Sequence, residues 1–177
     1  FKLMAFDIEV DARGSFPQLG SRILSVSYVT LKLGENVEPR ELVDRVEVIE
    51  ASNNSALVGR FLRAIDKERP DFLVGYNSID FDMKYILYEK YRSIADEEID
   101  PRSVRVERFV ETIHGGYVPH IDLFMVLDNL RGSLKIRSHG SYALDDVAVE
   151  AGAINPDDPF VSEMLRIEEA MDRTSIG

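Results

Sequence analysis

The apolar residues of this chain change their spacing along the sequence, and that change narrows the possible folds. Alternating or β-branched apolar runs predict strands, and apolar residues three or four apart predict helices. The predicted strands cover residues 2–10, 22–33, 45–49 and 71–77, and a β-hairpin over 103–124 turns at Gly115 and Gly116. The predicted helices cover residues 54–70, 80–93, 141–152 and 158–173. Strands first, then helices alternating with strands, predict an α/β fold in which a mixed sheet is flanked by helices.

Two carboxylates interrupt the first predicted strand, at Asp7 and Glu9 in the sequence FDIEV. Side chains two residues apart in a strand point to the same face, so these two anions would lie side by side. Burying such a pair is unfavourable unless a cation lies between them. Either an exposed strand face without a ligand or a cation-binding site therefore explains the pair.

The composition limits the classes of protein to which the chain can belong. Its 177 residues, 45% of them hydrophobic, suffice for one globular domain with a sizeable core. The formal net charge of −11 argues against a protein that coats duplex DNA with a basic face. It does not exclude an enzyme that handles a nucleic-acid end through metal ions, because such an enzyme uses carboxylates as ligands.

Three further features, the lack of cysteine, the length of the apolar runs and the first residue, each add one expectation. The chain has no cysteine, which excludes disulfides and thiolate metal sites and fits a cytoplasmic setting, near the nucleoid in a prokaryote. No apolar run is long enough to span a bilayer, so we expect no membrane partner. Residue 1 is Phe rather than Met and a strand begins almost at once, so we expect a fragment of a longer protein.

A second acidic stretch, GYNSIDFD, follows the short buried strand. Ser78 or Asp80 could cap the next helix, and acidic residues near a helix N-terminus suit its dipole. Alternatively, an Asp at the start of this helix converges with Asp7 and Glu9 at the edge of the sheet. Hard divalent cations such as Mg²⁺ prefer oxygen ligands of this kind.

Four motifs of the chain together resemble the exonuclease domain of family B DNA polymerases of the archaeal and eukaryotic replicative type. They are FDIE, GYNSIDFD, HIDLF and SYALDDVA, which follow one another in the family's order over nearly the whole chain. An Asp-x-Glu alone would be weak because short motifs occur by chance, but the combination is specific. The resemblance implies an RNase H-like fold. It also implies a DNA-directed DNA polymerase whose 3′→5′ proofreading activity hydrolyses the single-stranded 3′ end of DNA.

The same resemblance implies a metal site. Asp7 would ligate two divalent ions, Mg²⁺ or Mn²⁺, Glu9 would ligate one of them, and Asp82 would hold the second, partly through water. Two cations about 4 Å apart suit phosphodiester hydrolysis, because one lowers the pKa of a water and the other holds the leaving oxygen.

Candidate DNA contacts come from two stretches. By the resemblance, Asn77 and Phe81 match positions that meet the terminal nucleotides, with Tyr76 as a neighbour. A basic stretch in an otherwise acidic chain could contact phosphates or could be a solvated loop. Its cations are Arg131, Lys135 and Arg137.

The family's third motif, Tyr-x-x-x-Asp, contributes a Tyr that orients the attacking water and an Asp that completes the metal site. Tyr142 and Asp146 have this spacing, but at roughly 100° per residue they project from the face opposite the apolar residues of their helix. We interpret this spacing as a chance match (a decoy) rather than the third motif itself, since in the family a helix of the YxLxxVA kind precedes the third motif. Residues 1–177 would then be a single exonuclease domain that ends before this motif, with the remaining polymerase domains as its partners.

Two alternatives stay open at this point. The same fold could be a non-catalytic module that contacts DNA or other polymerase domains. It could also be a free-standing exonuclease that uses Tyr142 and Asp146 as its own third motif.

The other chemically active side chains have structural interpretations. Asp122 lies at a strand-to-helix junction, where an Asp usually makes local backbone hydrogen bonds. The three histidines have no metal-ligand spacing, and His114 is expected in the turn of the hairpin.

Overall fold

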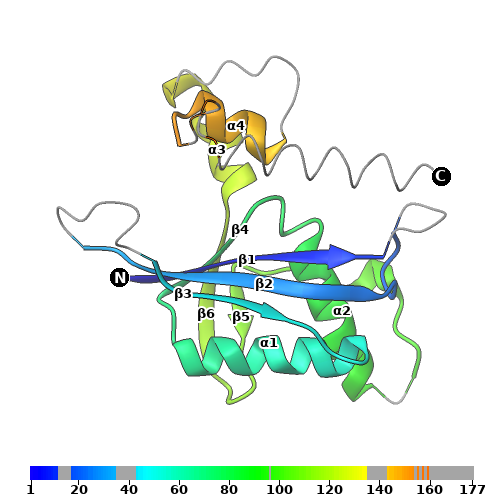
Figure 1. Ribbon diagram of the computed structural model, residues 1–177. Coiled ribbons are helices and arrows are strands. Elements are labelled where there is room, and N and C mark those ends of the chain that lie inside the picture. Colours follow the sequence, from blue (N-terminus) through cyan, green and yellow to red (C-terminus); the bar gives the residue numbers. More distant parts are fainter. Residues whose placement is uncertain are drawn as a thin grey trace. The chain divides into compact units, whose positions relative to one another are not determined.

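The computed structural model describes residues 1–11, 17–34, 43–95, 97–134, 143–153, 155, 157 and 159. The chain divides into two compact units, Phe1–Leu123 and Phe124–Gly177, which are described one after the other. Figure 1 shows the elements of each.

The first unit is built on a mixed, six-stranded sheet in the order β3-β2-β1-β4-β6-β5. Its strands are β1 (Lys2–Val10), β2 (Ile23–Lys32), β3 (Val43–Ile49), β4 (Phe72–Gly75), β5 (Phe109–Glu111) and β6 (Tyr117–Asp122). β4 is parallel to both of its neighbours, β1 and β6, while the other neighbours are antiparallel. The predicted strands and the predicted hairpin are confirmed, and Gly115 has the positive φ that its turn requires.

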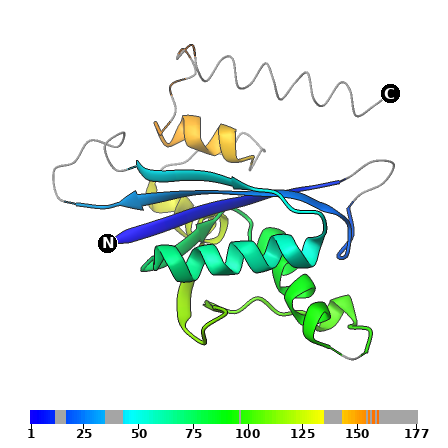
Figure 2. The ribbon, with the colours of Figure 1, turned by 60° about the horizontal axis from the view of Figure 1, so that its bottom comes forward.

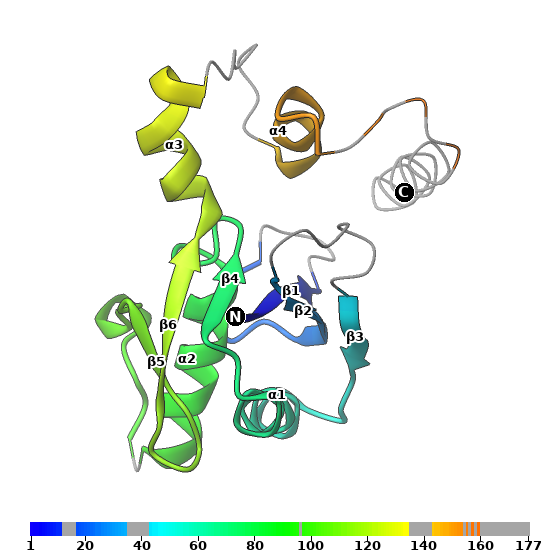
Figure 3. The ribbon, with the colours of Figure 1, turned by 90° about the vertical axis from the view of Figure 1, so that its left-hand side faces the viewer.

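One face of the sheet is covered by two helices, α1 (Asn54–Glu68) and α2 (Asp82–Ile94). Met4, Phe6 and Ile8 of β1 point into this core, where the Phe6 ring lies 5.2 Å from the ring of Phe61 on α1. Figures 2 and 3 show both helices on the same side of the sheet. The alternation in β1 therefore leaves Asp7 and Glu9 on the opposite, exposed face.

Helix α1 begins and ends where its sequence predicts. The Asn53 side chain accepts a hydrogen bond from the Ala56 amide at 2.8 Å and caps the N-terminus. Arg69 takes a left-handed conformation at the other end, directly before Pro70, which cannot continue a helix.

The second unit contains two described helices, α3 (Leu123–Leu134, whose first residue belongs to the first unit) and α4 (Leu144–Glu150). A helix was expected after Asp122, but the bounds of α3 were not predicted, because its sequence follows β6 without a breaker and contains Gly132. Helix α4 confirms the centre of the helix predicted over 141–152, and Gly152 has a positive φ at its end. A short 3₁₀ helix, η2 (Pro101–Ser103), lies in the first unit. The helix predicted over 158–173 lies almost entirely outside the described residues.

Candidate active site

The early end of β4 creates the place where the acidic residues meet. Its pairing with β1 covers only Leu3–Ala5, while β1 continues to Val10. Beyond the paired stretch, the backbone amide of Ile8 donates a 3.0 Å hydrogen bond to Oδ1 of Asp82. Asp82 is the first residue of α2, so a side-chain carboxylate takes the place of a neighbouring strand and joins the helix to β1.

Asp7 and Asp82 are hydrogen-bonded to each other through their side chains. Asp82 is 3% exposed, and its burial, followed by the nearby charge of Asp7, raises its pKa to about 7. Asp7 reaches the surface, yet partial loss of hydration raises the pKa of its carboxyl as well, against the lowering effect of the Asp82 hydrogen bond. Without a cation, the pair therefore shares a proton near neutral pH, with Asp82 donating to Asp7.

The residues at this point fit a divalent cation in ligand type and charge. Two carboxylates that repel each other are stabilised when a cation replaces their shared proton, and Mg²⁺ and Mn²⁺ prefer such oxygen ligands. Glu9 lies two residues from Asp7 on the same face of β1. Within the described part of the chain, however, no three acidic, His or Cys side chains are gathered into a metal-binding cluster. The structure thus brings Asp7 and Asp82 together and places Glu9 on β1, the strand of Asp7.

The predicted DNA contacts lie in the loop between β4 and α2. Asn77 is exposed and has a left-handed backbone conformation, with φ +54°. Phe81 is half-buried against Tyr85, with ring centroids 4.9 Å apart, and its amide donates to the Asn77 carbonyl at 3.1 Å. Tyr76 is half-buried. One turn therefore presents Asn77 and Phe81 directly before Asp82.

Neither Ser78 nor Asp80 caps α2, so the capping alternative is wrong. The N-cap residue is Phe81, and it makes no side-chain capping hydrogen bond. Ser78 instead points into the protein, where it is fully buried with its Oγ 2.9 Å from Nε2 of His120 on β6. Asp80 is exposed.

Asp122, the last residue of β6, has the structural role that was predicted, but it acts on a distant loop. Its Oδ1 accepts a hydrogen bond from the Asn77 amide and its Oδ2 accepts one from the Ile79 amide, both at 2.9 Å. The parallel register places Asp122 beside Gly75 and His120 beside Leu73. Sequence reasoning missed this arrangement because the register of parallel strands is not visible in local spacing.

The remaining candidates stay predictions. Asp146 is exposed on α4 in the second unit, whereas Tyr142 lies outside the described residues. Arg131 falls within α3 rather than in a loop. Lys135 and Arg137 lie outside the described residues.

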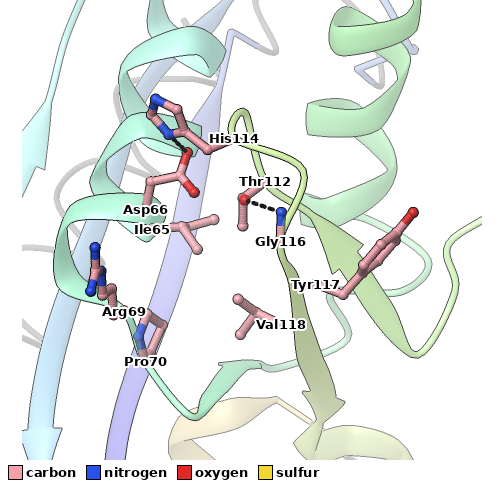
Figure 4. A pocket seen from close by; sticks show the side chains of 9 residues that line it. All are labelled: Ile65, Asp66, Arg69, Pro70, Thr112, His114, Gly116, Tyr117 and Val118. Carbon is pink, nitrogen blue, oxygen red and sulfur yellow. Dashed lines mark hydrogen bonds and ion pairs between the residues drawn. The ribbon is translucent and has the colours of Figure 1, made fainter.

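A groove at the other end of the parallel strands is separate from the acidic pair. It is lined by residues of the α1 C-terminus and of the β5–β6 hairpin, among them Asp66, Arg69 and Tyr117 (Figure 4). His114 Nδ1 lies 2.8 Å from Oδ2 of Asp66 here, which places His114 in the hairpin turn as predicted. The groove borders the starts of β4 and β6, while Asp82 and Asp122 lie at their ends.

Comparison with solved structures defines the fold class. The chain resembles the family B DNA polymerase from the hyperthermophilic archaeon Pyrobaculum calidifontis, with a TM-score of 0.58 and 24% sequence identity. The match covers 92% of this chain and 19% of that one. The mixed sheet and its flanking helices therefore define an RNase H-like domain, as predicted.

The sequence then gives the family. Residues 1–147 match the profile described as DNA polymerase family B, exonuclease domain, and the chain belongs to this family. It is 30% identical over 135 residues to a DNA polymerase of Thermococcus sp. (strain GE8), covering 71% of this chain and 8% of that protein. A DNA polymerase of Thermococcus gorgonarius is 29% identical over 135 residues, with 71% and 17% covered. The chain thus spans less than a fifth of the length of these relatives. Among the described helices, none has the length and apolar character needed to cross a membrane.

Proposed function

We propose that this chain is the proofreading module of a DNA-directed DNA polymerase, which removes nucleotides from the single-stranded 3′ end of DNA by metal-dependent hydrolysis. The observation that carries the proposal is the contact between Asp7 and Asp82, which are 75 residues apart in the sequence and meet where β4 ends. Family membership supports it, and a cytoplasmic location beside the genome follows from the proposed substrate.

The chain's own side chains divide the work in this proposal. Asp7, Glu9 and Asp82 would hold two divalent ions, Mg²⁺ or Mn²⁺, which when bound supply a hydroxide-like water and stabilise the charge on the leaving 3′-oxygen. Asn77 and Phe81, with Tyr76 beside them, would bind the terminal nucleotides and orient the last phosphodiester toward the carboxylates. The buried start of α2 keeps Asp82 fixed relative to β1 through the Ile8 amide.

The first test is the substitution Asp7→Ala in the full-length protein. We expect Mg²⁺-dependent shortening of a 3′-labelled single-stranded oligonucleotide to fall by about 100-fold or more, since removing a ligand disables metal-supported hydrolysis. Primer extension should be unchanged. Asp80→Ala is the matched control, because it removes an exposed acid of the same loop that contacts no predicted ligand. Exonuclease activity that survives in Asp7→Ala would remove Asp7 from the metal site.

One observation favours a second candidate, a non-catalytic module that contacts DNA or other polymerase domains. Within the part of the chain that the structure describes, no three acidic, His or Cys side chains form a group that could hold a metal ion. Wild-type protein that extends a primer but never shortens a single strand, at any Mg²⁺ or Mn²⁺ concentration, would establish this alternative. Shortening without extension would instead indicate a free-standing exonuclease.

We also propose that residues 1–177 form one domain of a longer polymerase and that its third motif follows them in sequence. The short share of each relative that the chain covers supports this. We expect the isolated chain to bind metal poorly and to hydrolyse DNA slowly, and a version extended through the next helices to be active. A fully active 177-residue chain that Asp146→Ala inactivates would show that Tyr142 and Asp146 are the third motif after all.

A further inference from the structure

We propose that a buried latch, formed by Ser78, His120 and Asp122, holds the loop between β4 and α2 in the conformation that presents Asn77 and Asp82 together. His120 is its positioning residue and acts through its Nε2 hydrogen bond to Ser78. This inference rests on the exonuclease function proposed above.

The first half of the latch is a side-chain pair sealed inside the protein. Ser78 is fully buried and His120 is 6% exposed, and their 2.9 Å contact joins the loop to β6. Ser78 can fold back this far only because Gly75 has no side chain, since a Cβ on Gly75 would lie 2.3 Å from the Ser78 Oγ. The loop and the end of β4 are therefore shaped for this contact.

The second half of the latch fixes the backbone on either side of Ser78. The Asp122 carboxylate accepts hydrogen bonds from the amides of Asn77 and Ile79, the two neighbours of Ser78. Asn77 has a φ of +54°, a region that L-residues adopt only when their surroundings require it, although Asn tolerates it better than most. Three hydrogen bonds from β6 thus hold three consecutive loop residues.

His120 also connects the loop to the strand that bears Asp7. Its ring centroid lies 5.9 Å from that of Phe6, the residue directly before Asp7. Its Nδ1 is buried and has no hydrogen-bond partner among the described residues. A buried nitrogen without a partner is unfavourable, so an apolar side chain would fill this space at less cost. The hydrogen bond between Nε2 and Ser78 therefore explains why position 120 is a histidine rather than an apolar residue.

The decisive comparison is between His120→Gln and His120→Asn in the full-length protein. A Gln side-chain nitrogen reaches the position of the His Nε2, whereas an Asn nitrogen reaches only the position of Nδ1. We expect His120→Asn to lower kcat/KM on a 3′-labelled single-stranded oligonucleotide by about 10- to 100-fold, mainly through KM, because small displacements of binding groups have effects of this size. His120→Gln should recover activity to within about threefold of the wild type, in line with the modest effect of retaining the hydrogen bond.

Two further variants separate positioning from general stability. Ser78→Ala removes the partner hydroxyl, and the double variant Ser78→Ala/His120→Asn should be no worse than the poorer single variant, because both remove one bond. Thr30→Val is the matched control. It removes another buried hydroxyl, on β2, which has no hydrogen-bond partner among the described residues, and it should leave kcat and KM unchanged.

The outcomes distinguish this inference from the proposed function. If both His120→Asn and Ser78→Ala are as active as the wild type, the latch is wrong. It is also wrong if His120→Gln and His120→Asn lose activity equally. Neither result contradicts the proposed exonuclease function. An inactive wild type overturns the exonuclease, and hydrogen exchange then decides the latch. Faster exchange of the amides of residues 76–80 in His120→Asn but not in His120→Gln supports it, and equal exchange in the two variants overturns it.

Discussion

At the scale of single residues, Asp82 carries two properties that oppose each other. Its burial beside Asp7 favours the protonated form of the carboxyl, while its proposed role as a ligand requires the ionised form. Its pKa of about 7 lies well above the usual value of 3.8. Between about pH 4 and pH 7, Asp82 therefore stays protonated in the folded protein but is ionised in the unfolded chain.

The direction of the resulting pH dependence follows from this difference. The contribution of Asp82 to the free energy of unfolding is fully present below about pH 4 and is lost as the pH rises to about 7. Without metal, we expect Asp82→Asn to be more stable than the wild type at pH 8 by at least about 1 kcal/mol, since one pKa unit corresponds to about 1.4 kcal/mol. The Asn carbonyl can still accept from the Ile8 amide.

Urea unfolding in EDTA at pH 5 and pH 8 measures this effect. The difference between the two pH values should shrink in Asp82→Asn and persist in the control Asp80→Asn. Added Mg²⁺ should stabilise the wild type at pH 8 and have little effect on Asp82→Asn. An equal pH difference in the wild type and Asp82→Asn would contradict the shared proton.

The sequence indicated which side chains share a face or a loop, but it did not indicate their hydrogen-bond partners. The period of a strand placed Asp7 and Glu9 on one face, and the motif GYNSIDFD pointed to Asp82 and Asn77. The hydrogen bonds of Ser78 and Asp122 were not predicted, because they join the loop to β6 across more than 40 residues of the chain. Such bonds depend on how parallel strands are aligned, and no local pattern encodes that alignment.

At the scale of elements, the turn from β4 into α2 leaves no room for a side chain at Gly75. Gly75 ends the strand in contact with the Ser78 side chain and 3.5 Å from the Phe6 ring, measured to the position of an added Cβ. Gly59, within α1, has only the flexible Arg63 guanidinium near such an atom, at 3.5 Å. The two glycines thus offer a matched pair of substitutions.

We expect opposite effects of Ala at these two positions. Gly75→Ala forces Ser78 away from His120 and should destabilise the fold by about 1–3 kcal/mol, the usual range for overpacking. Gly59→Ala should stabilise it by roughly 0.5–1 kcal/mol, because Ala is the better helix former. Chemical denaturation of both variants measures the difference. A Gly75→Ala variant as stable as the wild type would show that the loop tolerates another conformation.

Elements with a clear period were predicted well, and those without one were not. The alternation of β1 and the helical spacing of α1 gave nearly correct bounds. A side-chain cap was one of two interpretations for the start of α2, but α2 has no such cap, and the preceding loop is instead hydrogen-bonded to β6. A helix was expected after Asp122, but the bounds of α3 were not predicted, because its apolar start continues directly from β6.

At the scale of the molecule, all strands of the described sheet and all members of the main core cluster come from residues 1–123. We therefore expect a fragment of residues 1–123 to unfold cooperatively, with a thermal midpoint within about 5 °C of that of the 177-residue chain, a shift that corresponds to roughly 1 kcal/mol. Circular dichroism during heating tests this. A fragment without a cooperative transition would show that residues 124–177 are needed for the fold.

The shortness of β4 has a consequence for how the sheet could change. Because the strand stops at Gly75, the rung beside Ile8 is left for a carboxylate rather than a backbone carbonyl. A longer β4 would form a more regular ladder, and it would displace the Asp82 oxygen from the amide that now holds it. The early end of β4 is therefore what allows the Ile8 amide to hold Asp82, and extending the strand would cost the protein this hydrogen bond.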